Sequence, residues 1–254
     1  MPPKLIEQGK FSYLAAGEGK PIIVLHGLMG ALSNFDGVVN HFSENSYQVL
    51  IPQLPIYDLP LIKTNVNNIA KFVHKFMEHM GFEKASFMGN SLGGHVALVY
   101  ALKHPERVDQ LILTGSSGLY EKAFGDTFPR REDKEYVRVK TQDVFYDPKV
   151  ATDELVDDVF ETINDRSKLV RILSIAKSAI RHNMAKDVPN ITAETCLIWG
   201  NQDNVTPPDV AEEFNRLLSN SDLFWIDKCG HAPMMEHPEE FNRILDAWFK
   251  SKEA

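Results

Sequence analysis

The chain has 254 residues, of which 43% are hydrophobic and 24% charged, and its formal net charge is -8. This length and apolar content suit one or two globular domains, and the acidic balance argues against a general nucleic-acid or anionic-membrane binder. The N-terminus lacks the apolar run of a signal peptide, and no apolar run reaches the roughly 18–20 residues that span a bilayer. We therefore expect a cytoplasmic protein that does not bind membranes.

Two kinds of segment alternate along the chain from Pro21 onward: short apolar runs and stretches with helical periodicity. Apolar runs predict strands, and stretches with residues spaced three and four apart predict helices. The predicted strands cover 21–27, 47–53, 84–90, 110–115, 195–200 and 223–227, and the predicted helices cover 33–42, 66–80, 92–103, 210–218 and 239–249. Such alternation is typical of an α/β fold, in which a mostly parallel sheet is flanked by helices on both faces.

Residues 117–190 interrupt this alternation. A charged stretch over 130–135 predicts a solvated loop, and helical patterns follow over 152–163 and 168–183. The predicted organisation is therefore a core domain made of 1–116 and 191–254, with a helical cap, or lid, inserted over 117–190. The two cysteines, Cys196 and Cys229, lie in apolar, strand-like stretches and are predicted to be buried thiols in a reducing compartment.

Ser91 lies between glycines in the stretch Gly-Asn-Ser-Leu-Gly, which joins the predicted strand 84–90 to the predicted helix 92–103. The pentapeptide alone is weak support, because chance matches are common at a glycine usage of about 7%. Its place between a strand and a helix strengthens it, because a sharp turn there forces strained backbone angles and lifts the serine hydroxyl above the edge of the sheet. Ser91 is therefore the candidate nucleophile.

A serine hydroxyl needs a base to accept its proton near neutral pH. Among nine histidines, His231 stands out because it follows the last predicted strand, in a loop that reaches over the edge of the sheet. His26 also follows a strand, but the glycine after it indicates a role for the backbone. The remaining histidines lie in predicted helices, in the predicted cap or beside a helix start, where packed or exposed side chains are the simpler interpretation.

A carboxylate must then orient the imidazole and stabilise its charged form. Asp203 follows the predicted strand 195–200, whereas the alternative, Asp227, ends its own strand only four residues before His231. The order Ser91, Asp203, His231, with each residue just after a strand, is the order of a hydrolase triad. We therefore predict these three residues to be catalytic.

Three segments together, Pro21–Gly30, Lys84–Leu102 and Cys196–Phe249, resemble the α/β-hydrolase superfamily. The resemblance covers nearly the whole chain apart from the predicted cap. It implies an acyl-type serine hydrolase that uses no metal and no organic cofactor. It also implies an oxyanion hole formed by the backbone N–H groups of Leu28 and Leu92, with His26, Gly27 and Asn90 as supporting residues.

Two groups of enzymes within this superfamily are candidates for the activity of this chain: esterases and carbon–carbon bond hydrolases. Asn90 and the stretch CGHAPMMEHPEEFNR resemble carbon–carbon bond hydrolases, which cleave vinylogous 1,5-diketones formed by aromatic ring fission. Those enzymes commonly have a tryptophan where this chain has Ala232, and a cap arginine where residues 154–160 are acidic. Arg166, Arg171 or Arg181 are the candidates to replace that arginine.

On these grounds the sequence favours a hydrolase of small, partly apolar esters or thioesters, with carbon–carbon bond cleavage as the alternative. An acyltransferase and a perhydrolase stay open, because both use the same triad. From another class, a non-catalytic receptor on the same fold also stays open. The sequence leaves the choice between monomer and homodimer undecided.

Overall fold

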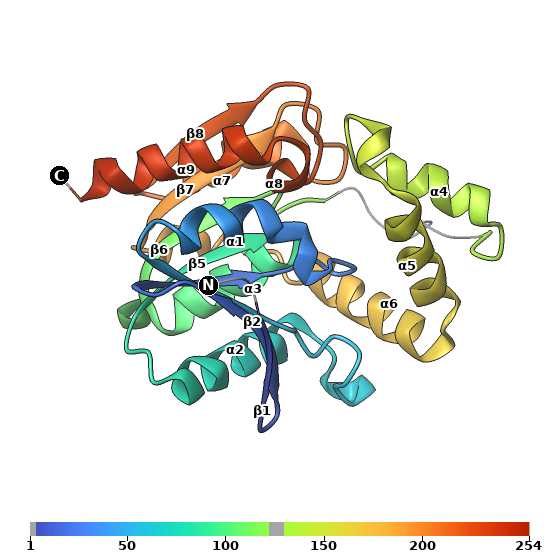
Figure 1. The fold of residues 1–254 in the computed structure, drawn as a ribbon, viewed down its shortest axis with the longest axis horizontal. Helices are drawn as coiled ribbons and strands as arrows, with labels where there is room; N and C mark the ends of the chain where they lie inside the picture. Colours follow the sequence, from blue (N-terminus) through green and yellow to red (C-terminus); the bar gives the residue numbers. More distant parts are fainter. Residues whose placement is uncertain (1–3, 122–129, 254) are drawn as a thin grey trace.

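An eight-stranded sheet forms the centre of the computed structural model, which describes residues 4–121 and 130–253 (Figure 1). Its strands follow the order β1-β2-β4-β3-β5-β6-β7-β8 across the sheet. Strands β3 to β8 run parallel, whereas β2 pairs antiparallel with both β1 and β4. The bounds are β1 Lys4–Gln8, β2 Phe11–Ala16, β3 Lys20–Leu25, β4 Tyr47–Pro52, β5 Ala85–Asn90, β6 Val108–Thr114, β7 Glu194–Gly200 and β8 Ser221–Ile226.

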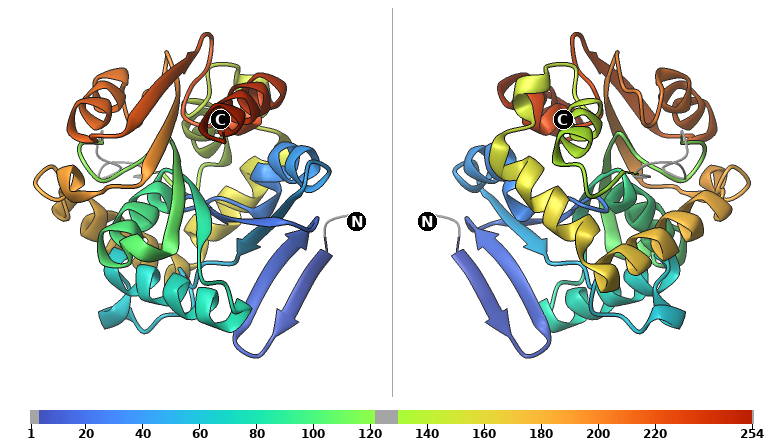
Figure 2. Two further views of the ribbon diagram at one scale, coloured as in Figure 1. Left: turned by 90° about the vertical axis from the view of Figure 1, so that its left-hand side faces the viewer. Right: turned by 90° about the vertical axis from the view of Figure 1, so that its right-hand side faces the viewer.

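Helices cover both faces of this sheet (Figure 2). One apolar cluster packs α2, α3 and α7 against one face, and a second packs α1 and α9 against the other. Successive residues of β3 point into opposite clusters, which is why this strand is apolar without alternation. The α-helices of the described residues are α1 Asp36–Ser43, α2 Val66–Met80, α3 Leu92–Lys103, α4 Lys134–Gln142, α5 Asp153–Asn164, α6 Arg166–Arg181, α7 Pro208–Leu217, α8 Pro233–Glu236 and α9 Pro238–Lys252.

The predicted α/β fold is confirmed, and helices α2 and α3 have the predicted bounds. Local signals fix the ends of α2: the Asn65 side chain accepts a hydrogen bond from the Asn68 N–H at 3.0 Å, and Gly81 ends the helix with a left-handed φ of 71°. These contacts are local in sequence, so pattern and structure agree there.

Several predictions of local structure were wrong. The antiparallel hairpin β1–β2 was not predicted, because it precedes the first predicted strand, and α4 begins inside the stretch 130–135 that was predicted to be a loop. The predicted helix 33–42 is a short 3-10 turn followed by α1. Both cysteines are buried and free as predicted, but Cys229 lies in the loop after β8 and not in a strand.

The segment between β6 and β7 carries α4, α5 and α6, hereafter the inserted helices (Figure 1). They lie together at one end of the sheet, beyond the carboxyl ends of the parallel strands. Residues 122–129 of the predicted cap lie outside the described residues, and the division into core and cap domains stays a prediction. None of the helices described is both long and apolar enough to cross a membrane.

Candidate active site

Ser91 occupies the sharp turn between β5 and α3 that the sequence predicts. Its φ of 54° and ψ of -119° lie in a region that costs a non-glycine residue about 1–3 kcal/mol. Backbone hydrogen bonds hold this conformation: the Ser91 N–H donates to the Thr114 carbonyl at 3.2 Å, and the Ser91 carbonyl accepts from the Ser117 N–H at 3.1 Å. The end of β6 and the loop that follows it thus hold the serine in its strained conformation.

Glycine is required on both sides of this turn. A Cβ atom on Gly93 would lie 1.9 Å from the Leu25 carbonyl oxygen, and one on Gly89 would lie 2.4 Å from the Gly93 carbonyl carbon. Both distances are far below van der Waals contact, and the atoms met are backbone atoms that cannot turn away. The glycines therefore let α3 start directly against the end of β3.

His231 and Asp203 form a buried hydrogen-bonded pair. The His231 Nδ1 lies 2.9 Å from Asp203 Oδ2 and 3.2 Å from Oδ1, and the two residues are 6% and 2% exposed. Because a carboxylate only accepts hydrogen bonds, this contact places the imidazole proton on Nδ1 and leaves Nε2 as the basic nitrogen. The sequence alternative, Asp227, is exposed and accepts a hydrogen bond from Gln202 at 3.3 Å.

Asp203 is itself held rigidly. Its Oδ1 accepts hydrogen bonds from the backbone N–H groups of Val205 at 2.8 Å and Thr206 at 2.9 Å, and its Oδ2 accepts from the Thr206 hydroxyl at 2.9 Å. These donors compensate for burying a negative charge. The turn-forming stretch after β7 therefore serves a carboxylate that faces His231.

The pKa of His231 reflects two opposing effects. Burial lowers it, but the Asp203 carboxylate raises it, with smaller contributions from Glu121 and Glu236, and the net pKa lies above the ordinary value for histidine. A base acts only when unprotonated, so the rate should fall as pH drops through this raised pKa. We expect the acid limb of kcat/KM for a cleaved substrate to have its midpoint above pH ~6.5, the ordinary histidine pKa. A pH–rate profile with its acid limb below that value would contradict this expectation.

The predicted supporting residues connect the loops around Ser91. His26 Nδ1 lies 2.8 Å from the Gly27 carbonyl, and His26 Nε2 accepts the Leu54 N–H at 3.0 Å. Burial lowers the pKa of His26, which agrees with a neutral ring that fixes backbone. The Asn90 side-chain amide donates to the carbonyls of Thr114 and His231, each at 3.0 Å, and so links the turn at Ser91 to the histidine loop.

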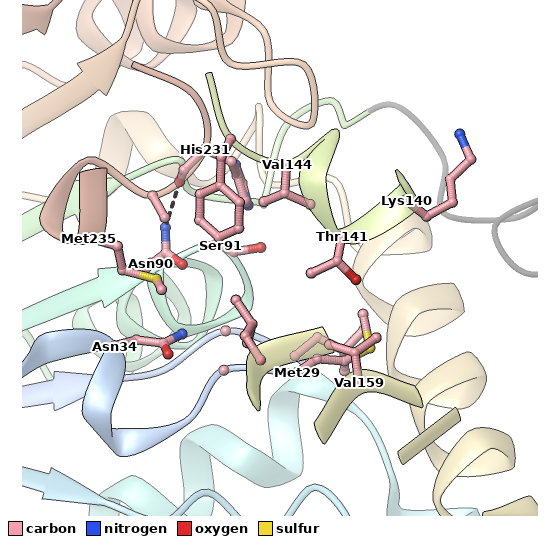
Figure 3. A pocket seen from close by; sticks show the side chains of 16 residues that line it. Met29, Asn34, Asn90, Ser91, Lys140, Thr141, Val144, Val159, His231 and Met235 are labelled. Atoms are coloured by element: carbon pink, nitrogen blue, oxygen red, sulfur yellow. Dashed lines mark hydrogen bonds between the residues drawn. The ribbon is translucent and has the colours of Figure 1, made fainter. Parts of the chain in front are cut away.

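A pocket opens directly over the Ser91 hydroxyl, with His231 beside it (Figure 3). Gly27 and Leu28 border it, and Leu92 is the first residue of α3, directly after Ser91. One predicted oxyanion donor therefore lies in the loop after β3 and the other at the start of α3. Most lining side chains are apolar. The described lining consists of Gly27, Leu28, Met29, Gly30, Asn34, Asn90, Ser91, Lys140, Thr141, Val144, Phe145, Leu155, Val159, His231, Ala232 and Met235.

Charge is sparse in this pocket. Lys140 is the cationic side chain of the described lining, and its amino group points away from the cavity (Figure 3) and donates to Asp143 at 3.0 Å. The described lining includes none of the three arginines that the sequence offered for a substrate carboxylate, and the Arg171 Nε donates to the Leu59 carbonyl at 3.1 Å.

Sequence reasoning did not identify Thr141, Val144, Leu155 and Val159 as residues that line the pocket. Thr141, Leu155 and Val159 come from α4 and α5, and Val144 and Phe145 from the segment after α4. The spacing of four between Leu155 and Val159 places them on one helix face and was the one local signal available.

The parallel sheet, the turn at Ser91 and the paired His231 and Asp203 define an α/β hydrolase. The chain belongs to the alpha/beta hydrolase fold family, whose profile matches residues 20–192 and 160–238. The expected fold and the expected class of enzyme, a hydrolase, are thereby confirmed.

Three individual proteins are similar to this chain over most of its length. The chain is 51% identical to MGS-MChE2, an alpha/beta hydrolase enzyme from a metagenome of lagoon sediments, with a TM-score of 0.83 and coverage of 99% of this chain and 100% of that one. It is 30% identical to a 2-hydroxy-6-oxononadienedioate/2-hydroxy-6-oxononatrienedioate hydrolase of Comamonas testosteroni, over 90% of this chain and 87% of the relative. A meta-cleavage product hydrolase of Pseudomonas fluorescens IP01 shares the fold, with 23% identity, a TM-score of 0.82 and coverage of 95% and 94%.

Proposed function

We propose that the protein hydrolyses a small molecule with Ser91 as nucleophile, His231 as base and Asp203 as the carboxylate that orients the imidazole. The observation that carries the proposal is the buried His231–Asp203 pair in the same pocket as the strained Ser91 turn. The backbone N–H groups of Leu28 and Leu92 are the proposed oxyanion donors, and each such donor lowers the barrier by about 3 kcal/mol.

The substrate class that we propose is a 2-hydroxy-6-oxo-dienoate, cleaved at a carbon–carbon bond. Support comes from the curated relatives, whose names specify hydrolases of such compounds and which match about nine tenths of this chain. This reverses the preference for esters drawn from the sequence. The apolar walls of the pocket, formed by residues such as Val144, Leu155 and Val159, suit the carbon skeleton of such a compound.

In the proposed reaction the dienol first takes its keto form, so that the carbon to be released becomes a CH2 next to the 6-carbonyl. The Ser91 oxygen then attacks that carbonyl carbon while His231 accepts the hydroxyl proton. The bond to the CH2 carbon breaks, its electron pair leaves as a conjugated enolate, and the proton from His231 completes the hydroxydienoate product. Water, deprotonated by the same imidazole, releases the second acid from the acyl-enzyme and restores the Ser91 hydroxyl.

A second candidate is hydrolysis of esters or thioesters through the same acyl-enzyme. The observation that favours it is the lack of a cation directed into the described pocket, because Lys140 points away and pairs with Asp143. A dienoate carries a carboxylate that benefits from such a partner, whereas a neutral ester does not.

Steady-state kinetics on both substrate classes test the proposal. We expect a 2-hydroxy-6-oxo-dienoate to be cleaved at a higher kcat/KM than p-nitrophenyl esters of graded chain length. Cleavage is followed by the loss of the absorbance that arises from conjugation of the dienol with the 6-oxo group. A preference for the esters would favour the second candidate.

Labelling with a fluorophosphonate probe tests the nucleophile independently of the substrate. We expect the protein to be labelled and the label to disappear in Ser91→Ala, because only an activated serine reacts with the probe. An unlabelled wild-type protein would favour the non-catalytic receptor instead.

A further inference from the structure

Glu236, at the end of the short helix α8, uses both carboxylate oxygens to join two segments that are far apart in sequence. Oε1 accepts the Gly230 N–H at 2.7 Å, directly before His231. Oε2 accepts the Tyr146 N–H at 2.7 Å and the Asp147 N–H at 3.3 Å, in the segment that follows α4. One half-buried side chain therefore holds both the histidine loop and the entry into the inserted helices.

The two segments are also packed tightly together. The His231 N–H donates to the Val144 carbonyl at 3.0 Å, and a Cβ atom on Gly230 would lie 2.6 Å from that same carbonyl oxygen. Val144 and Phe145 form part of the pocket wall. The loop that carries the imidazole and this part of the wall therefore have little freedom to move independently while the Glu236 bonds are in place.

The other side of the inserted helices is attached to the core by different contacts. The Arg171 Nε donates to the Leu59 carbonyl at 3.1 Å, and the Ser174 hydroxyl donates to the Thr64 carbonyl at 3.1 Å. These bonds hold α6 and do not touch the histidine loop. On the side of α4, two contacts attach the inserted segment to the core: the Glu236 carboxylate accepts N–H groups of residues 146 and 147, and the Val144 carbonyl accepts the His231 N–H.

We propose that Glu236 is a positioning residue: its carboxylate fixes segment 144–147 to the histidine loop. The pocket wall and the His231 imidazole are thereby held in a fixed position relative to each other. This inference rests on the proposed role of His231 as base, and it holds for either substrate class. Through its charge, Glu236 also helps to keep the pKa of His231 raised, together with Asp203 and Glu121.

The test compares Glu236→Gln and Glu236→Asp with the wild-type protein. A glutamine has one acceptor oxygen, so its NH2 group faces an N–H donor on one side, and the negative charge is lost. An aspartate keeps the charge but is one methylene too short to reach both segments. Glu239→Gln serves as the matched control, because it removes the same charge from an exposed residue in the next helix.

We measure the rate of fluorophosphonate labelling against pH, together with hydrogen exchange of peptides covering 143–150. In Glu236→Gln we expect labelling to slow by about 10- to 100-fold, exchange at Tyr146 and Asp147 to accelerate, and the acid limb to move to lower pH because a negative charge beside His231 is gone. In Glu236→Asp we expect slower labelling and faster exchange with the acid limb near its wild-type position. Glu239→Gln should match the wild type in all three.

Wild-type labelling rates and wild-type exchange in both Glu236 variants would overturn the inference. So would slower labelling that only follows a lower melting temperature, with an unmoved acid limb in Glu236→Gln. The probe reports on Ser91 and His231 whatever the natural substrate is, so failure to cleave a dienoate would contradict the proposed substrate and not the role of Glu236.

Discussion

Replacing Asp203 by asparagine is expected to lower kcat by about four orders of magnitude while the protein stays folded. The asparagine oxygen can still accept the N–H groups of Val205 and Thr206, which now bond to Asp203 Oδ1 at 2.8 and 2.9 Å. Its NH2 group would then face His231 Nδ1 and stabilise the tautomer whose proton lies on Nε2. In that tautomer the imidazole cannot accept the Ser91 proton.

The matched control is Asp227→Asn, since Asp227 is exposed and bonds to Gln202 instead of His231. We expect it to keep kcat within a few-fold of the wild type. Circular dichroism and urea unfolding should show that both variants are folded, and single-turnover kinetics on a cleaved substrate should separate them. Near-native turnover in Asp203→Asn, or a large loss in Asp227→Asn, would show that the wrong carboxylate has been assigned.

Replacing Gly93 by alanine is expected to destabilise the fold by at least about 3 kcal/mol. The new Cβ would lie 1.9 Å from the Leu25 carbonyl oxygen and 2.9 Å from the His26 carbonyl oxygen. Relief of this contact requires α3 to move away from the end of β3, which would disturb both the turn at Ser91 and the loop that carries Leu28. The free energy of unfolding in urea measures the effect, and a very low yield of folded protein would agree with it.

Gly27→Ala is the matched control for this steric effect. A Cβ atom there would lie 3.5 Å from Asn90 Oδ1 and 3.5 Å from Ser91 Cβ, which is ordinary van der Waals contact. We expect this variant to fold with a stability within about 1 kcal/mol of the wild type, because a buried Cβ atom at these distances requires no neighbouring atom to move. If Gly93→Ala unfolded at the same urea concentration as Gly27→Ala, the close approach of α3 to β3 would not be a constraint on the fold.

Predictions from the sequence agree with the structure where an element is set by interactions between residues close in sequence, and they fail where it is set by contacts between distant residues. Helices α2 and α3 were predicted to the residue, because periodicity, caps and the glycine-flanked turn are all local signals. The hairpin β1–β2 was missed because β1 is mostly exposed at the edge of the sheet and has no apolar run. Helix α4 was missed because eight of the residues from 130 to 140 are charged, and its inward face can be recognised only once the helix packs.

The residues of the candidate site also fall into those that the sequence suggested and those that only the structure revealed. The sequence pattern proposed Ser91, Asp203 and His231 as the candidate triad, since each lies shortly after a strand and the carboxyl ends of parallel strands meet at one edge of the sheet. Spacing could not choose firmly between Asp203 and Asp227, nor find the bonds of Glu236, nor show that Arg171 serves the backbone of residue 59. Those features depend on how loops separated by tens of residues pack against one another. Their side chains acquire direction and partners only in the folded chain, because no local periodicity encodes contacts between distant loops.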